Sequence, residues 1–470
     1  MKKKLIAALC TLAVSVGLLS GCSQGAESDA GRETSAQEET AGGAAEENTQ
    51  KEEVVVTMPA TSEPESGFDP AFGWGAGEHV HEPLIQSTLT VTTQDLQMDK
   101  DLAADYSVSE DGMTWTVTIR DDVKFTDGEP LTARDVAFTY NNCKEKSSVN
   151  DFTMLEEAVA VDDTTVEFHM TRPYSIWPYT MAIVGIVPEH AYDENYGQNP
   201  IGSGRYIMKQ WDKGQQVIFE ENPDYYGEEP KIKKLTVLFM EKDAALAAAM
   251  AGEVDVAHTA ASYSDQSVEG YELFSVQTVD NRGFNLPCST PQEKDGVTYG
   301  NEFTSDVNVR RAINIGIDRQ EMIDNVLNGY GTAAYSVCDK MPWYNPESEV
   351  EYDPEEAKKI LEDAGWKKGT DGIRKKDGVR AEFTLMFSNG DSVRQALAAS
   401  SLEESYDLWQ KAQWDGTTGI TQEGDIPWIW LCNIDHLYFV RDGLQIAEQK
   451  IHPHGHGWSI VNNVDQWSWE

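Results

Sequence analysis

The sequence contains few cysteines, and no two of them form a CxxC pair. Beyond the first 22 residues they are scattered along the chain, at Cys143, Cys288, Cys338 and Cys432. This spacing argues against a paired-cysteine zinc box, and it predicts no particular disulfide. The HExxH pattern of zinc-dependent hydrolases is also absent.

Basic residues are scarce as well: 37 Lys and Arg stand against 80 Asp and Glu, for a formal net charge of −43. A surface this acidic repels phosphate backbones, so we expect no nucleic-acid partner. Small cations or basic peptides are attracted to such a surface. The same charge also serves plain solubility at a crowded cell surface, and the sequence leaves both readings open.

The apolar run that stands out, in MKKKLIAALCTLAVSVGLLSGC at residues 1–22, follows three lysines. It is too short for a membrane span and is typical of an export signal. Leu19-Ser20-Gly21-Cys22 resembles the bacterial lipobox, which implies a signal peptide at 1–21 and a lipid anchor on Cys22. The alternative is a secreted protein that is cut near this point and carries no lipid.

Residues 23–53 contain no aromatic side chain and consist mainly of Glu, Ala, Gly, Ser, Thr and Gln. Such a segment buries too little apolar surface to offset its ordering entropy. With Cys22 it predicts an acidic, disordered tether over 22–53, and a location on the outer face of the bacterial cell membrane or in the periplasm.

From Val54 onward, strand and helix patterns alternate. Residues 54–56 and 113–120 read as strands, and Thr132 followed by Asp135 is typical of a helix start. Apolar spacing predicts a helix over 307–327 that is broken near 317–319, and another that begins at Pro354. These patterns indicate α/β lobes.

Four blocks of the body carry a family resemblance. TWTVTIRDDVKFTDGEPLTARDVAFTYN at 114–141, the stretches 199–240 and 248–257, and DVNVRRAINIGIDRQEMIDNVLNGYGTAA at 306–334 resemble the family 5 extracellular solute-binding proteins, and they occur in that family's order. These proteins are the oligopeptide, dipeptide and nickel receptors of ABC importers.

The resemblance implies a type II periplasmic-binding-protein-like fold, with two lobes around a cleft and an extra domain. We expect domain I at 54–90, 200–300 and 452–470, domain II at 91–199, and domain III at 301–451. Gly202 and Gly204 precede an expected strand, not a helix, which argues against a nucleotide loop.

The family pattern breaks after a run at 383–387 that reads as a buried strand. Several dozen expected residues are missing near 398–401, so the third domain is predicted to be incomplete. Because 391–414 holds no Pro or Gly, we expect its two half-helices to fuse. The chain is therefore either a compact variant or a shortened remnant that does not transport.

IHPHGHGW at 451–458 places three histidines at alternate positions, which share one side of an extended chain. The resemblance places this stretch and the GEHVHE stretch at the same cleft. Borderline nitrogen donors suit nickel or a nickel chelate, whereas Pro and Gly also suit an ordinary loop. The candidate metal ligands are His79, His81, His452, His454 and His456.

Tryptophans are the other candidate cleft residues, although a place in the core is their default. Trp428-Ile429-Trp430 alternates, which we interpret as one indole facing the cleft and one facing the interior. The candidate cleft residues are Trp74, His79, His81, Trp428, Trp430 and Trp458.

The sequence thus favours a monomeric, membrane-anchored receptor that passes a short peptide or a nickel chelate to an ABC permease and its ATPase. It predicts no catalytic residue and no required cofactor, with nickel as cargo. A surface metal-dependent hydrolase and a non-transporting remnant of the receptor fold are the alternatives.

Overall fold

The computed structural model describes residues 51–72, 84–93, 97–147, 150–336, 339–341, 344, 346–385, 426, 428–449, 451 and 459–470. Gln50 to Glu470 form one compact unit with a mixed α/β fold. Within the described part, no helix combines the length and the apolar character that crossing a bilayer requires. The predicted signal peptide, most of the tether and the fused helix at 391–414 lie outside the described residues.

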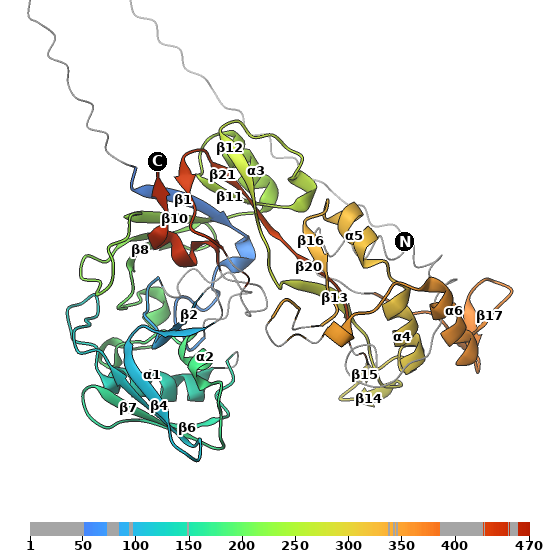
Figure 1. Cartoon of the computed structure of the whole chain (residues 1–470), viewed down its shortest axis with the longest axis horizontal. Helices are drawn as coiled ribbons and strands as arrows, with labels where there is room; N and C mark the ends of the chain where they lie inside the picture. The colour runs from blue at the N-terminus through green and yellow to red at the C-terminus, as the bar shows by residue number, and fades with distance from the viewer. Residues whose placement is uncertain are drawn as a thin grey trace, which may run out of the picture. The chain divides into compact units, whose positions relative to one another are not determined.

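A seven-stranded mixed sheet collects strands from three distant parts of the chain (Figure 1). Its strands, in spatial order, are β12 (Tyr271–Val276), β21 (His436–Arg441), β11 (Val256–Thr259), β1 (Glu53–Met58), β10 (Lys234–Phe239), β9 (Gln216–Glu221) and β8 (Tyr206–Asp212). β1 runs parallel to β10 and β11, and the other pairs are antiparallel. The helix α3 (Lys242–Met250) packs against β11.

The predicted strand over 54–56 is confirmed as β1. Because β1 lies in the middle of the sheet, between β11 and β10, its apolar side chains pack in the core. Val54 and Val56 are fully buried, in the same core as Phe219 and Trp467. The predicted strand after Gly202 and Gly204 is confirmed as β8. A Cβ atom on Gly202 would lie 1.9 Å from the carbonyl oxygen of Ile85, so only glycine fits this approach.

A second sheet is four-stranded and antiparallel, and its core is built around Trp177 and Tyr140. The strands are β4 (Ala103–Val108), β5 (Thr114–Ile119), β7 (Thr165–Met170) and β6 (Leu155–Ala160), with α1 (Ala133–Lys146) packed on β6 and β7. The predicted helix start is confirmed: Asp135 Oδ2 accepts from the backbone N–H of Thr132 at 2.9 Å.

The third sheet is three-stranded, in the order β13 (Asn281–Asn285), β20 (Trp428–Ile434) and β16 (Gly331–Ala333). It shares a core with α4 (Val307–Gly316), α5 (Arg319–Val326) and α6 (Pro354–Asp363). The predicted break near 317–319 is confirmed, because Asp318 caps α5 by accepting from the N–H of Glu321 at 2.9 Å. Asp353 likewise caps α6.

The remaining elements are short. They are α2 (Trp177–Met181), β2 (Thr90–Thr92) with β3 (Met98–Lys100), β14 (Gln292–Lys294) with β15 (Val297–Tyr299), β17 (Lys367–Lys368) with β18 (Arg374–Lys376) and β19 (Val379–Arg380), β22 (Leu444–Gln445) with β23 (Ser468–Trp469), and the 3₁₀ turns η1 (Ala60–Ser62), η2 (Glu189–Ala191), η3 (Tyr196–Gln198), η4 (Ala261–Tyr263), η5 (Pro346–Ser348) and η6 (Ile460–Gln466).

One predicted strand is wrong as far as it is described. Within 383–387, residues 383–385 belong to no strand, and their side chains are partly or fully exposed. Phe383 instead stacks on Phe303, with ring centroids 6.3 Å apart. An apolar run predicts burial, but a strand also requires a neighbouring strand for backbone hydrogen bonds. Here the ring of Phe383 is covered by aromatic stacking, which needs no such neighbour.

Candidate functional site

Most of the predicted site residues lie outside the described part of the chain. Trp74, His79, His81, His452, His454, His456, Trp458 and Cys22 fall there, so the nickel hypothesis and the lipid anchor stay predictions. The described residues contain no group of three or more His, Cys, Asp or Glu that would hold a metal ion. Of the candidate cleft residues, the structure places Trp428 and Trp430.

Both of these tryptophans lie on β20, and the prediction that they face opposite ways is wrong. Residues two apart in a strand share a face, and β20 is regular from Trp428 to Trp430 in its pairing with β13. Ile429, between them, is fully buried in the third core. The two indoles therefore lie together on the opposite face of the strand.

A buried arginine fixes the position of β20. Arg319 Nε donates to the carbonyl oxygens of Trp430 at 2.9 Å and Ala334 at 3.0 Å, and Nη1 donates to that of Asn314 at 2.9 Å. Its guanidinium also lies 5.0 Å from the ring of Tyr335. Burial lowers the pKa of Arg319 to about 10, so it remains charged at neutral pH.

Two adjacent connections join the seven-stranded sheet to the three-stranded sheet. Residues 277–280 link β12 to β13, and Asp435 alone links β20 to β21, which Figure 1 shows as one nearly continuous ribbon. We call these two connections the crossing. Thr278 Oγ1 donates to the carbonyl of Ile434 at 2.7 Å, and the N–H of Ile434 donates to the carbonyl of Asp280 at 3.0 Å.

Charged side chains gather at the crossing. Asp280 forms an ion pair with Arg282, and its Oδ2 lies 3.2 Å from Nε2 of His436. The side chains of Asp280 and His436 are only 5% and 8% exposed, so their contact is shielded from water. On the more open side, Ser275 donates to Asp435 Oδ2 at 3.3 Å.

Burial and neighbouring charges shift the pKa values here. Burial raises the pKa of Asp435 and lowers that of Lys340, and attraction between the two charges opposes both shifts. His258 on β11 is fully enclosed, with its ring centroid 6.1 Å from that of His436. Burial, followed by the charge of Lys242 and by His436, holds the pKa of His258 well below 6.5.

Sequence reasoning did not find this cluster. His258 stands inside the apolar stretch VDVAHTA, an unusual place for an imidazole, and that was the available signal. Asp280 and His436 are 156 residues apart and share no motif. The crossing therefore becomes visible only when the two strand pairs are placed side by side.

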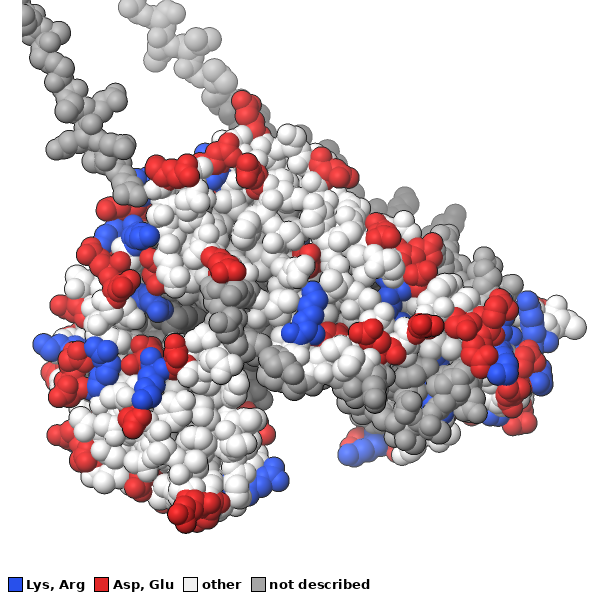
Figure 2. Space-filling model, in the orientation of Figure 1, with Lys and Arg blue, Asp and Glu red and all other residues white. Residues whose placement is uncertain are grey.

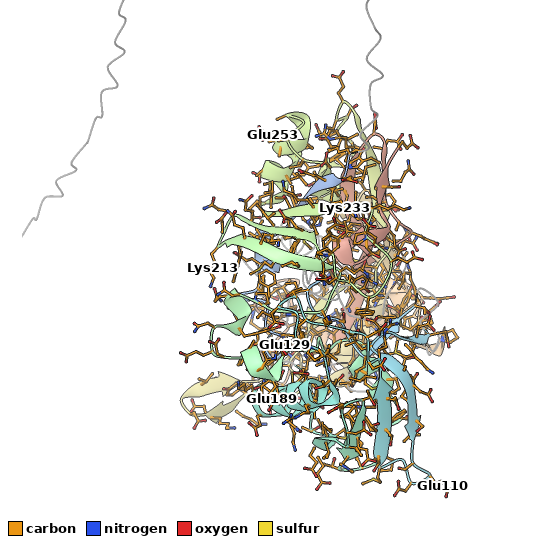
Figure 3. All side chains as sticks on the ribbon, turned by 90° about the vertical axis from the view of Figure 1, so that its left-hand side faces the viewer. Glu110, Glu129, Glu189, Lys213, Lys233 and Glu253 are labelled. Carbon is orange, nitrogen blue, oxygen red and sulfur yellow. The ribbon has the colours of Figure 1, made fainter. Side chains whose placement is uncertain are left out.

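The surface charge agrees with the composition. On the face in Figure 2, Asp and Glu side chains are interspersed with Lys and Arg and with uncharged areas. Figure 3 shows Glu110 at the turn between β4 and β5, and Glu253 in the turn after α3. Both side chains are exposed, so the charges of Glu110 and Glu253 are solvated and belong to no site.

Comparisons with known proteins agree with this architecture. The family model for bacterial extracellular solute-binding proteins, family 5, matches residues 97–405. Protein XP55 of Streptomyces lividans is 35% identical over 368 residues, which cover 74% of this chain and 64% of that protein. The oligopeptide-binding protein AppA of Bacillus subtilis is 28% identical over 344 residues, or 69% and 62% of the two chains. The chain thus spans less than two thirds of these relatives.

Solved structures share the fold. The structure of NikZ from Campylobacter jejuni in complex with Ni(L-His) superposes with a TM-score of 0.72 at 21% sequence identity. The superposition covers 89% of this chain and 99% of NikZ. At this level of identity the likeness concerns the fold alone.

Proposed function

The chain belongs to the bacterial extracellular solute-binding proteins of family 5, and we propose that it captures a short peptide or a nickel chelate for an ABC importer. The observation that carries the proposal is the crossing. Two short, adjacent connections, residues 277–280 and Asp435, carry the chain between the seven-stranded sheet and the three-stranded sheet. Such a ribbon permits two lobes to rotate as rigid bodies around a ligand.

Binding of this kind needs no covalent chemistry. Ligand stabilises the closed arrangement because it contacts both lobes at once, and the closed form then docks on the permease. Buried Arg319 supports this scheme, because it holds β20 firmly to α5 and Ala334 while the crossing bends. AppA is a binding protein by name and the NikZ structure contains Ni(L-His), which favours a receptor over a hydrolase.

Two cargo classes fit the proposal. AppA is named for oligopeptides and the NikZ complex contains Ni(L-His), so both classes occur on this fold. His79, His81, His452, His454 and His456 supply the nitrogen donors that a nickel chelate requires. The tryptophans at 74, 428, 430 and 458 supply apolar surface for either cargo.

The domain boundaries in the proposal follow the crossing. The predicted division assigned 281–285 to domain I and 436–441 to domain III, whereas β13 pairs with β20 and β21 pairs with β11 and β12. We therefore place the boundaries between domains I and III at 277–280 and at Asp435. Domain II stays at 91–199, around the four-stranded sheet.

The proposed attachment to the membrane is a lipid on Cys22 followed by the tether. Where the tether meets the body, Lys51 Nζ contacts Asp255 Oδ1 at 2.8 Å and lies 4.0 Å from the ring of Trp469. The last tether residues are thus held on the seven-stranded sheet. The tether, whose composition predicts disorder, would let the body turn to meet its permease.

Isothermal titration calorimetry tests the proposal with three probes: Ni²⁺, Ni²⁺ with free histidine, and a mixture of di- to pentapeptides. We expect saturable, roughly one-to-one binding of at least one probe, with compaction in small-angle X-ray scattering. Binding without turnover separates a receptor from a hydrolase, since a hydrolase consumes the peptides. A folded chain that binds no probe would match the shortened, non-transporting remnant instead.

A further inference from the structure

One carboxylate contacts both sides of the crossing. Asp280 lies in the 277–280 connection, pairs with Arg282 on β13, and reaches His436, the first residue of β21. β13 belongs to the three-stranded sheet and β21 to the seven-stranded sheet. The contact between Asp280 and His436 therefore joins the two sheets through side chains at the point where the backbone also joins them.

We propose that the Asp280–His436 contact is a proton-operated latch, which stiffens the crossing in mildly acidic medium and slows the exchange of ligand. The inference rests on the proposed function, because it assigns a control to the rotation on which that function depends. A charged imidazolium donates a stronger hydrogen bond to a carboxylate than a neutral imidazole does. Burial of both partners keeps solvent from screening this difference.

Charged and titratable groups face His436 from several elements. On β11, His258 stays neutral, because burial and the charge of Lys242 disfavour its cation. On β13, Arg282 already pairs with Asp280. On the far side of the backbone, Asp435 adds a second negative charge, which Lys340 offsets in part.

The direction of the effect follows from this arrangement. Histidine is the side-chain type whose charge can respond to pH between 5 and 8, so the proposal is tested between pH 7.5 and 5.5. In that range the latch strengthens as pH falls and weakens as pH rises. The ring of Tyr438 also lies nearby, with its centroid 5.3 Å from that of His258.

Hydrogen exchange of the intact protein without ligand tests the latch. Mass spectrometry follows peptides that cover 277–282 and 433–438 at pH 7.5 and 5.5, with rates corrected for intrinsic exchange. We expect protection at the crossing to rise about fivefold at the lower pH in the wild type. In His436→Gln, which keeps a neutral donor, we expect protection to be equal at the two pH values.

A matched control exists in the same chain. His190 Nε2 lies 2.8 Å from Asp127 Oδ2, a second histidine–aspartate contact that is remote from the crossing and more exposed. His190→Gln should keep the pH dependence at the crossing unchanged. Wild-type protection that does not respond to pH, or a response that survives in His436→Gln, would overturn the proposal.

Dissociation of a bound probe gives an independent measurement. For whichever of the nickel–histidine chelate or the peptide mixture binds, dissociation should slow about fivefold from pH 7.5 to 5.5 in the wild type and not in His436→Gln. Equal rates at both pH values in the wild type would disprove control of ligand exchange. Failure of every probe to bind would reject the proposed function, while the exchange experiment still decides whether the latch exists.

Discussion

A Cβ atom on Gly283 would lie 2.2 Å from Nε1 of Trp428, so the indole of Trp428 occupies space that only a glycine leaves open. Gly283 on β13 pairs with Trp430 on β20, and the pairing is interrupted by a bulge between Arg282 and Gly283. The position of Trp428, a candidate ligand contact, thus depends on a residue of the neighbouring strand.

Gly283→Ala should displace this indole and lower the free energy of unfolding by about 1–3 kcal/mol. Urea denaturation followed by tryptophan fluorescence measures both effects. Adding Trp428→Phe removes the clashing Nε1 atom and should recover part of the loss. If Gly283→Ala were as stable as the wild type, the prediction would be wrong, and β13 and β20 would have to move apart at little cost.

Arg319→Met should lower the free energy of unfolding by about 3–5 kcal/mol, because the carbonyls of Trp430, Ala334 and Asn314 lose their donor. Arg319→Lys should recover little, since an ammonium cannot reproduce the planar fork. Thermal unfolding compares the two variants. As a control, Arg120→Met breaks an exposed pair with Asp122 and should cost less than about 1 kcal/mol.

Asp306 links stability to pH. Burial raises its pKa, but hydrogen bonds from Lys376, Trp366 and the N–H of Asn308 outweigh burial and hold the pKa below 3.8. A carboxyl with a lowered folded-state pKa stabilises above its unfolded value, so this contribution is lost as pH falls below about 3.8. Asp306→Asn should cost about 1 kcal/mol at pH 7, because the charged hydrogen bond to Lys376 is lost, and the cost should disappear at lower pH. A constant difference between wild type and variant from pH 7 to 2.5, in urea denaturation, would contradict this linkage.

The described cysteines should differ in reactivity. Cys143 and Cys432 are buried, and burial raises the pKa of Cys432 to about 12, whereas Cys288 is exposed. Because the thiolate is the nucleophile, iodoacetamide at pH 8 should alkylate Cys288 in the folded protein and leave the other two unmodified. Peptide mass spectrometry reads the sites, and denaturation in urea provides the control in which all three react.

The root of the tether should be anchored by Asp255 rather than by Lys51. Asp255 accepts from Lys51, from Arg441 Nε at 2.8 Å and from the N–H of Val55 at 2.9 Å, and its side chain is 4% exposed. Asp255→Ala should therefore cost about 3 kcal/mol, because it leaves a partly buried cation and an N–H without their acceptor. Lys51→Ala should cost less than about 1 kcal/mol, since Lys51 is half exposed. Thermal unfolding of both variants tests this order.

Local features were predictable from the sequence because they depend on a few neighbouring residues. The capping pair Thr132 and Asp135 and the break at Asp318 each act within one turn. The strand expected at 383–387 failed because its apolar pattern says nothing about a pairing partner. The faces of Trp428 and Trp430 were predicted wrongly, although the period of a strand already placed them together.

The crossing was beyond local reasoning for a different reason. Asp280 and His436 approach only after two antiparallel pairings, β12 with β21 and β13 with β20, have set their registers. The family resemblance placed the two histidine stretches at the cleft and pointed to no residue of the crossing. The histidines that the sequence emphasised lie outside the described residues, and their role stays a proposal.

The place of β1 inside the seven-stranded sheet has a consequence for biosynthesis. β1 leaves the ribosome early, yet Glu53 pairs with Lys234, 181 residues later, and the sheet also needs β21 near the end of the chain. The growing polypeptide therefore cannot complete this sheet until translation is almost finished. Any stop codon before residue 436 therefore releases a product that lacks β21, a strand inside this sheet.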